Sequence, residues 1–336
     1  MTAVKDSPWQ SLLRRLSRIG FTRTYVRKAL PEWWEDALWT KPTGFAQGAL
    51  ILSRNLGVDL LSLRSSSEEI TFEGFGRPKF KRTARTKSKG VGVAQAVGYR
   101  AAVVAAAATS RPYQQLPESP KSMRDDLVGK GRAPCVNLDN LLDYCWDNGL
   151  PIIHVSQFPA GTTKFDGMAT VIHGRPVIVL ANNHSFGAWQ AFILAHELGH
   201  VACGHLQEGS FLVDKDIRVK DSDREERQAD DFAAELLLGN PRLHYTAEFR
   251  LNGERLAEAA RKAGSNSRTD PGVVALNYGY YNNMMGAAMN ALKILEPTPS
   301  AKKSLHERMV SNIDSGRVDE DRLHWFLYLT TSDDPK

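Results

Sequence analysis

A histidine–glutamate–x–x–histidine motif is the stretch whose residue types and spacing best suit chemistry. It is formed by His196, Glu197 and His200. On a helix, residues four apart lie one turn apart on the same face, so the two imidazoles can bind one metal ion. Glu197 is rotated by about 100° from His196 and borders the metal without having to bind it. This arrangement suits a zinc-activated water beside a carboxylate base.

The residues around the motif predict the helix that positions it. Leu194, Leu198 and Val201 form an apolar stripe at i, i+4 and i+7, roughly opposite the histidines. Ser185 is a candidate N-cap for this helix. The alternative interpretation is a helix with two surface histidines, because short motifs also match by chance.

A second helix can supply a third ligand, since a catalytic zinc usually has three protein ligands and one open position. The segment 221–238 carries apolar residues at core spacing and stops at Gly239-Asn240-Pro241. Glu226 can bind the metal. Asp230, one turn later, can accept the far N–H of a histidine ligand. The alternative is an acidic, solvent-exposed helix face.

The two segments together resemble the ImmA/IrrE family of metallopeptidases, which are gluzincin-like. Their second motif has the form E-x-E-A-[ND]-x-F-A-x-x-L-L, and from Glu226 this chain reads E-R-Q-A-D-D-F-A-A-E-L-L. The second glutamate of the family is Gln228 here, and an amide is a poor zinc ligand. The spacing of Glu226 and Asp230 favours Glu226 as the ligand. The resemblance is strongest from about residue 150 to about residue 240.

The resemblance implies a fold, a cofactor and a partner. The fold would be α+β, with a zincin-like core of a small β-sheet, the H-E-x-x-H helix and the glutamate-bearing helix. Zn²⁺ would be held by His196, His200 and Glu226, with Glu197 catalytic and Asp230 supporting a histidine. Members of the family typically cleave a helix-turn-helix repressor in phage, mobile-element or stress regulation, so we expect a specific protein substrate of that kind.

Composition places the chain among ordinary globular proteins. It has 336 residues, 42% hydrophobic and 24% charged, enough for two or three domains. Three cysteines favour a reducing compartment, and the N-terminus has no signal-peptide pattern. The most apolar run, 101–108, is too short to span a membrane. We therefore expect a cytoplasmic enzyme without a membrane partner.

Composition shifts along the chain predict four parts. They are a helical N-terminal domain over 1–64, a basic linker over 65–90, the metallopeptidase domain over 91–296 and a C-terminal helical tail over 297–336. The first part resembles a helix-turn-helix only faintly, but it has a cluster of basic side chains: Arg14, Arg15, Arg18, Arg23, Arg27 and Lys28. An alternative function is therefore a non-proteolytic DNA-binding or antirepressor-type protein that retains the zinc fold. The simpler interpretation of these charges is a solvated face.

Other segments carry weaker predictions. Strands over 169–172 and 177–180 would form a hairpin beside the metal helix. Its edge would pair with extended substrate, or the hairpin would only support the helix. The proline-rich segment 110–134 predicts an exposed loop or a second linker, and the segment 273–281 predicts a short strand. His244 and Tyr245 are candidate oxyanion donors, or simply surface residues.

Overall fold

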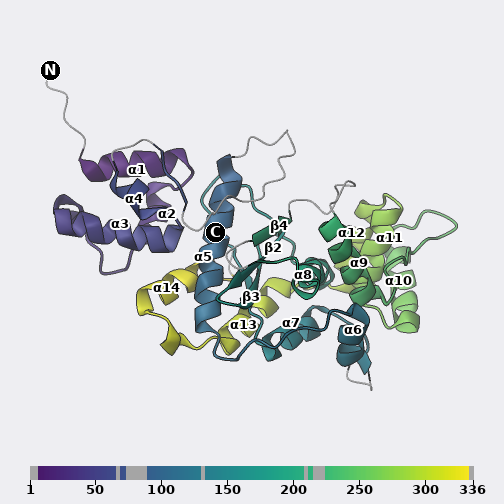
Figure 1. Ribbon diagram of the computed structural model, residues 1–336. Helices are drawn as coiled ribbons and strands as arrows, with labels where there is room; N and C mark the ends of the chain where they lie inside the picture. Colours follow the sequence, from purple (N-terminus) through teal and green to yellow (C-terminus); the bar gives the residue numbers. More distant parts are fainter. Residues whose placement is uncertain are drawn as a thin grey trace.

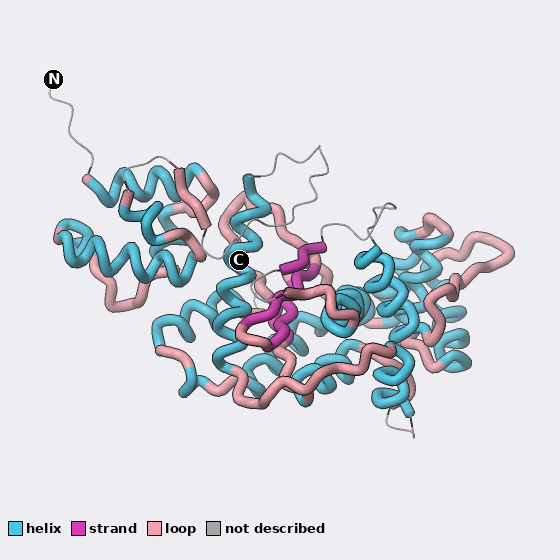
Figure 2. Tube along the Cα trace, in the orientation of Figure 1, coloured by secondary structure: helices cyan, strands magenta, loops and turns pink. Residues whose placement is uncertain are grey.

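The computed structural model describes residues 7–65, 69–72, 89–129, 133–207, 211–214 and 224–332. A small sheet lies within a largely helical protein (Figures 1 and 2), which confirms the predicted α+β class. Within these described ranges, no helix is long and apolar enough to cross a membrane.

The sheet has four strands in the order β1-β3-β2-β4 within the described residues. Strand β1 runs parallel to β3, and the other neighbours are antiparallel. The predicted hairpin is present, but its turn is tighter: His173 and Gly174 alone connect β2 to β3, both with positive φ. Such two-residue turns match the twist of paired strands. The strands are β1 (Ile152–His154), β2 (Gly167–Ile172), β3 (Arg175–Leu180) and β4 (Phe211–Asp214).

The prediction that this hairpin forms the sheet edge beside the metal helix is wrong. Strand β3 lies between β1 and β2, and β4 pairs with Gly167–Thr170 of β2. Strand β4 has four residues and follows the metal helix in the chain. Its pairing with β2 is therefore a long-range contact that no local sequence pattern predicts. Among the described strands, β1 and β4 are the edges.

The two faces of the sheet belong to different cores. In β3, Val177 and Val179 join one apolar cluster, whereas Ile178 and Leu180 join the other. This alternation follows from the two-residue period of a strand. Helix α5 packs on the first face and helix α8 on the second, so the sheet is the middle of three layers (Figure 1).

The helices after the N-terminal region surround this sheet. Their bounds are α5 (Lys89–Ala108), α6 (Pro120–Val128), α7 (Leu138–Asp147), α8 (Gly187–Ala202), α9 (Arg224–Leu238), α10 (Gly253–Ser267), α11 (Pro271–Tyr281), α12 (Met285–Leu295), α13 (Ala301–Asn312) and α14 (Glu320–Leu329).

Two segments differ from prediction because proline begins a helix in each. Ser119 caps α6 ahead of Pro120, within the segment predicted to be a loop. Asp270 caps α11 ahead of Pro271, where a short strand was predicted. Proline is favoured in the first turn of a helix, and a capped start there overrides the β-preference of Val273 and Val274.

The start of the metal helix α8 is also capped differently from the prediction. Ser185 does not cap it; Phe186 occupies the cap position and offers no side-chain acceptor. Instead the Glu296 carboxylate accepts the Gly187 N–H at 2.8 Å and the Ser300 N–H at 3.1 Å. A carboxylate at a helix N-terminus interacts favourably with the helix dipole.

The N-terminal region contains α1 (Pro8–Arg18), α2 (Arg23–Lys28), a 3-10 turn (Asp36–Thr40), α3 (Pro42–Leu56) and α4 (Leu60–Arg64). Its apolar residues belong to the same cluster as α5, one face of the sheet and α14. The Trp325 indole N–H donates to the Asn55 carbonyl at 3.0 Å, and the Tyr25 hydroxyl donates to the Gln157 carbonyl at 3.1 Å. The domain boundaries stay predictions, and most of the basic linker, 73–88, lies outside the described residues.

The C-terminal end of α9 is held by a buried arginine. The Arg124 guanidinium donates to the Leu236 and Leu237 carbonyls at 2.8 and 2.9 Å, and to the Arg268 carbonyl at 2.7 Å. The last carbonyls of a helix have no partner within the helix, so a buried cation there satisfies acceptors that would otherwise be unpaired.

We expect Arg124→Met to lower the free energy of unfolding by about 2–3 kcal/mol, because it leaves buried carbonyls without donors. Urea denaturation followed by circular dichroism measures this change. Arg227→Met is the matched control, since Arg227 is exposed on the same helix. Equal losses in the two variants would contradict a capping role for Arg124.

Candidate metal centre

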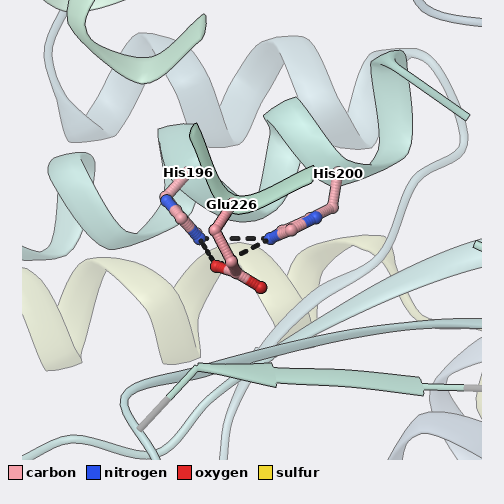
Figure 3. A group of neighbouring side chains, drawn as sticks. All are labelled: His196, His200 and Glu226. Carbon is pink, nitrogen blue, oxygen red and sulfur yellow. Dashed lines mark hydrogen bonds and ion pairs between the residues drawn. The ribbon is translucent and has the colours of Figure 1, made fainter. Parts of the chain in front are cut away.

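Two helices bring three ligand-type side chains together (Figure 3). His196 and His200 lie one turn apart on α8, and both are buried. Glu226 lies in the first turn of α9 and is half-buried. One ligand atom from each of the three lies within 4.8 Å of the others. Gln228, the other residue considered for the third ligand, instead contacts His205, whose Nε2 lies 3.1 Å from the Gln228 Oε1.

The helices can approach this closely because small residues form their contact. A Cβ placed on Gly199 would lie 2.8 Å from the Ala229 Cα and 3.1 Å from the Phe232 Cβ, so any larger residue there would separate α8 from α9. Gly199 immediately precedes His200, and Ala229 immediately precedes Asp230. The contact therefore sets the distance between the ligands of one helix and those of the other.

The spacing of the three ligand atoms matches a tetrahedral metal site. The two Nε2 atoms are 3.1 Å apart, and the Glu226 Oε2 lies 3.4 Å from the His196 Nε2 and 3.6 Å from the His200 Nε2. Bonds of about 2.0–2.1 Å in a tetrahedron place neighbouring ligand atoms about 3.4 Å apart. Two imidazole nitrogens and one carboxylate oxygen are also a donor set that zinc uses in catalytic sites.

The histidines also favour the ionised form of Glu226. Hydrogen bonding to His196 and His200 holds the pKa of the Glu226 carboxyl well below its ordinary value, although partial burial acts in the opposite direction. Glu226 is therefore a carboxylate at neutral pH and can bind a cation.

Asp230 contacts the first histidine of the motif. Its Oδ1 is 2.9 Å from the His196 Nδ1. With Nε2 of His196 engaged as a ligand, Nδ1 carries the hydrogen and donates it to this carboxylate. Such a contact orients the ring and makes its free nitrogen a stronger ligand.

The second histidine has a corresponding partner that the sequence did not predict. The His200 Nδ1 is 2.9 Å from the His205 Nδ1, and the His205 Nε2 is 3.1 Å from the Gln228 Oε1. If the His200 Nε2 binds a metal, the His200 Nδ1 donates its hydrogen to the His205 Nδ1. The His205 Nε2 then donates its hydrogen to the side-chain carbonyl of Gln228. Gly204, with φ of 70°, forms the turn that brings His205 back to the helix end. Spacing gave no signal for this contact, because His205 lies beyond the helix.

Glu197 is buried against the beginning of strand β2. A Cβ placed on Gly167 would lie 2.3 Å from the Glu197 Oε1, so the carboxylate occupies the space of a missing side chain. Gly167 pairs with Leu180 of β3 and Asp214 of β4, so its backbone is held on both sides. The sheet therefore determines where the Glu197 carboxylate can lie.

The two candidate oxyanion donors each contact a residue outside the ligand group. His244 stacks on Tyr281 with ring centroids 3.6 Å apart, and the Tyr245 hydroxyl lies 3.0 Å from the Ser267 Oγ. Neither contact links them to the three ligand atoms.

Residues 151–265 match the family model described as the IrrE N-terminal-like domain, a peptidase family. This match confirms the resemblance to the ImmA/IrrE family over that part of the chain. The matched residues include both metal helices and strands β1 to β4, and the family points to a metallopeptidase. Searches of curated proteins and of solved structures each found no match.

We expect Asp230→Ala and His205→Ala each to weaken zinc binding about 10–100-fold, because each leaves a ligand ring without its outer partner. Competition with a chromophoric chelator measures the affinity. His324→Ala, an exposed histidine on α14, serves as the control and should bind zinc normally. Unchanged affinity in His205→Ala would show that its contact with His200 does not support the ligand.

Proposed function

We propose that this protein is a zinc-dependent endopeptidase with a zincin-like core, and that it cleaves a specific regulatory protein such as a helix-turn-helix transcriptional repressor. The metal site is supported by the triangle formed by the His196 Nε2, the His200 Nε2 and the Glu226 Oε2, which lie 3.1, 3.4 and 3.6 Å apart. The family match over 151–265 supports the peptidase activity. The choice of a repressor rests on the family resemblance alone.

The ligand set suits zinc. His196 and His200 would offer imidazole nitrogens and Glu226 a carboxylate oxygen. A catalytic zinc usually keeps a fourth position open for water or substrate. A zinc ion held there would polarise a peptide carbonyl and lower the pKa of a water molecule.

Glu197 performs the proton transfers in this proposal. Its carboxylate accepts a proton from the water that attacks the peptide carbonyl carbon, and it then gives a proton to the amine nitrogen as the C–N bond breaks. Asp230 and His205 hold the two ligand rings in orientation throughout. The packing against Gly167 keeps the Glu197 carboxylate in one place between turnovers.

The alternative of a DNA-binding or antirepressor protein receives less support from the contacts of the N-terminal arginines. Arg15 is buried and donates to the Ser62 and Ser65 carbonyls. Arg27 donates to the Pro31 and Trp34 carbonyls, and Arg23 pairs with Asp36. Arg15 and Arg27 thus satisfy backbone carbonyls within this region, whereas the Arg23–Asp36 pair is exposed and contributes little to folding.

We expect Glu197→Gln to retain zinc and to lose cleavage by about 10²–10⁴-fold, because an amide cannot accept the proton. Glu226→Ala should lose zinc as well, since two ligands hold it weakly. Zinc content of the purified variants, together with new protein N-termini in cells expressing each variant, measures both effects.

The wild type is the reference in this comparison, and new N-termini that appear only with it name the substrate. Normal cleavage by either variant would contradict the mechanism. If the wild type and Glu197→Gln both retain zinc and show the same N-termini, the result would favour a protein that binds its partner without cutting it.

We expect Gly167→Ala to lower cleavage of that substrate at least about 10²-fold while zinc binding persists, because the new methyl group displaces the Glu197 carboxylate. Initial rates and zinc affinity are measured together. Gly286→Ala on α12 is the matched control, since nothing lies within 4 Å of its added Cβ. Full activity in Gly167→Ala would mean that the position of Glu197 does not depend on this packing.

A further inference from the structure

A polar cavity lies beyond the strand ends, where the metal helix α8 begins. Its volume is about 520 Å³, within the range of about 300–1,000 Å³ that is usual for ligand sites. Its walls come from the β1–β2 connection, the β3–α8 connection and the first turn of α13. The parallel strands β1 and β3 both end here, and ligands often bind beyond the carboxyl ends of parallel strands.

The cavity is separate from the metal centre. The described residues that line it include neither the three ligand residues nor Glu197. A rise of about 1.5 Å per residue places Gly187, the first residue of α8, about 13 Å along the helix from His196. Lys302, which lines the cavity, lies outside the residues 151–265 that match the family model. Neither the proposed mechanism nor the family match therefore accounts for this cavity.

The charged side chains that line the cavity are both cationic. Lys164 comes from the β1–β2 connection and Lys302 from the first turn of α13. Both are half-buried, although lysine usually stays exposed. No aspartate or glutamate is among the described residues that line the cavity. A cavity lined by charges of one sign attracts ligands of the opposite sign, so this one favours an anion.

Neighbouring groups hold Lys164 in position. Its Nζ donates to the Asn183 Oδ1 at 3.0 Å and to the Ser156 carbonyl at 3.4 Å. It also lies over the Phe158 ring, 5.4 Å from the ring centroid. Because these three partners are uncharged, they position the ammonium group without neutralising it. A side chain that is ordered before the ligand arrives loses less conformational entropy on binding.

Two helices begin beside the cavity and add to its positive potential. The Ala301 N–H at the start of α13 donates to the Ser185 carbonyl at 3.2 Å, two residues before α8 begins at Gly187. Each helix N-terminus carries a partial positive charge. The Glu296 carboxylate accepts a backbone N–H near both starts and offsets part of this charge, but it does not line the cavity. The lysine charges therefore dominate the cavity itself.

Size and hydrogen bonding identify the class of ligand. Thr162 and Ser185 contribute hydroxyl groups to the lining, and Asn183 contributes an amide. A phosphate group has several acceptor oxygens and up to two negative charges, which suit two ammonium groups with hydroxyl and amide groups around them. The volume also leaves room for an organic group attached to the phosphate.

We propose that this cavity is a phosphate-binding site, in which Lys164 and Lys302 hold the phosphate group of a small phosphorylated molecule or of free phosphate. The site is additional to the metal centre and does not depend on the peptidase function.

Calorimetry on the zinc-loaded, full-length protein tests the site with four compounds. Adenosine 5′-monophosphate and ribose 5-phosphate are phosphate esters, inorganic phosphate is the group alone, and adenosine lacks it. At least one of the three phosphate compounds should bind with a Kd below about 1 mM and at least about tenfold more tightly than adenosine. Tighter binding of an ester than of inorganic phosphate would identify a phosphorylated molecule as the ligand, and the reverse order would identify free phosphate.

Lys302→Met should weaken this binding about tenfold or more, because one of the two charges is lost. Lys303→Met is the matched control, since Lys303 is exposed on the same helix, pairs with Glu307 and does not line the cavity. It should bind like the wild type. Glu226→Ala, which lacks a metal ligand, should also bind phosphate compounds normally, because the cavity lies away from the metal centre.

Three outcomes would overturn the phosphate site. They are failure of every phosphate compound to bind the wild type, equal binding of these compounds and adenosine, and equal affinities in Lys302→Met and Lys303→Met. Loss of binding in Glu226→Ala would place the phosphate at the metal instead, and would also overturn the proposal. The first three outcomes would leave the proposed peptidase function unaffected.

Discussion

The contact between Gly199 and Ala229 is the constraint on which the rest of the site depends. Each helix carries only part of the ligand set, so the site exists only at one separation of α8 and α9. A glycine and an alanine let the two backbones approach until the imidazole and carboxylate atoms form one triangle.

How well each part of the site could be predicted from the sequence depends on how far apart the interacting residues lie in the chain. His196 and His200 share one helix, and its 3.6-residue period alone places them on one face. Glu226 comes from another helix, and its choice over Gln228 needed the spacing to Asp230 and the family motif. The packing of Gly167 on Glu197 could not be predicted, because it depends on the register of β2 with two neighbours. His205 escaped prediction because it reaches His200 from a turn rather than from a periodic position.

The outer partners of the two histidines differ in charge. His196 contacts the Asp230 carboxylate, whereas His200 contacts His205, which in turn contacts the Gln228 amide, so no carboxylate supports His200. Glu226, Glu197 and Asp230 already place three carboxylates around a site for a divalent cation. An amide at 228 orients the second ring without adding another negative charge there, so the sequence difference from the family motif is compatible with metal binding.

The N-terminal helices, α5, one face of the sheet and α14 share a continuous apolar core, and the hydrogen bonds of Trp325 and Tyr25 cross it. Segments from both ends of the chain therefore pack against each other independently of the covalent connection through residues 73–88. If a cellular protease nicked that connection, the two fragments would remain associated as a non-covalent complex. Loss of the intact polypeptide on a denaturing gel would then not mean loss of the folded protein.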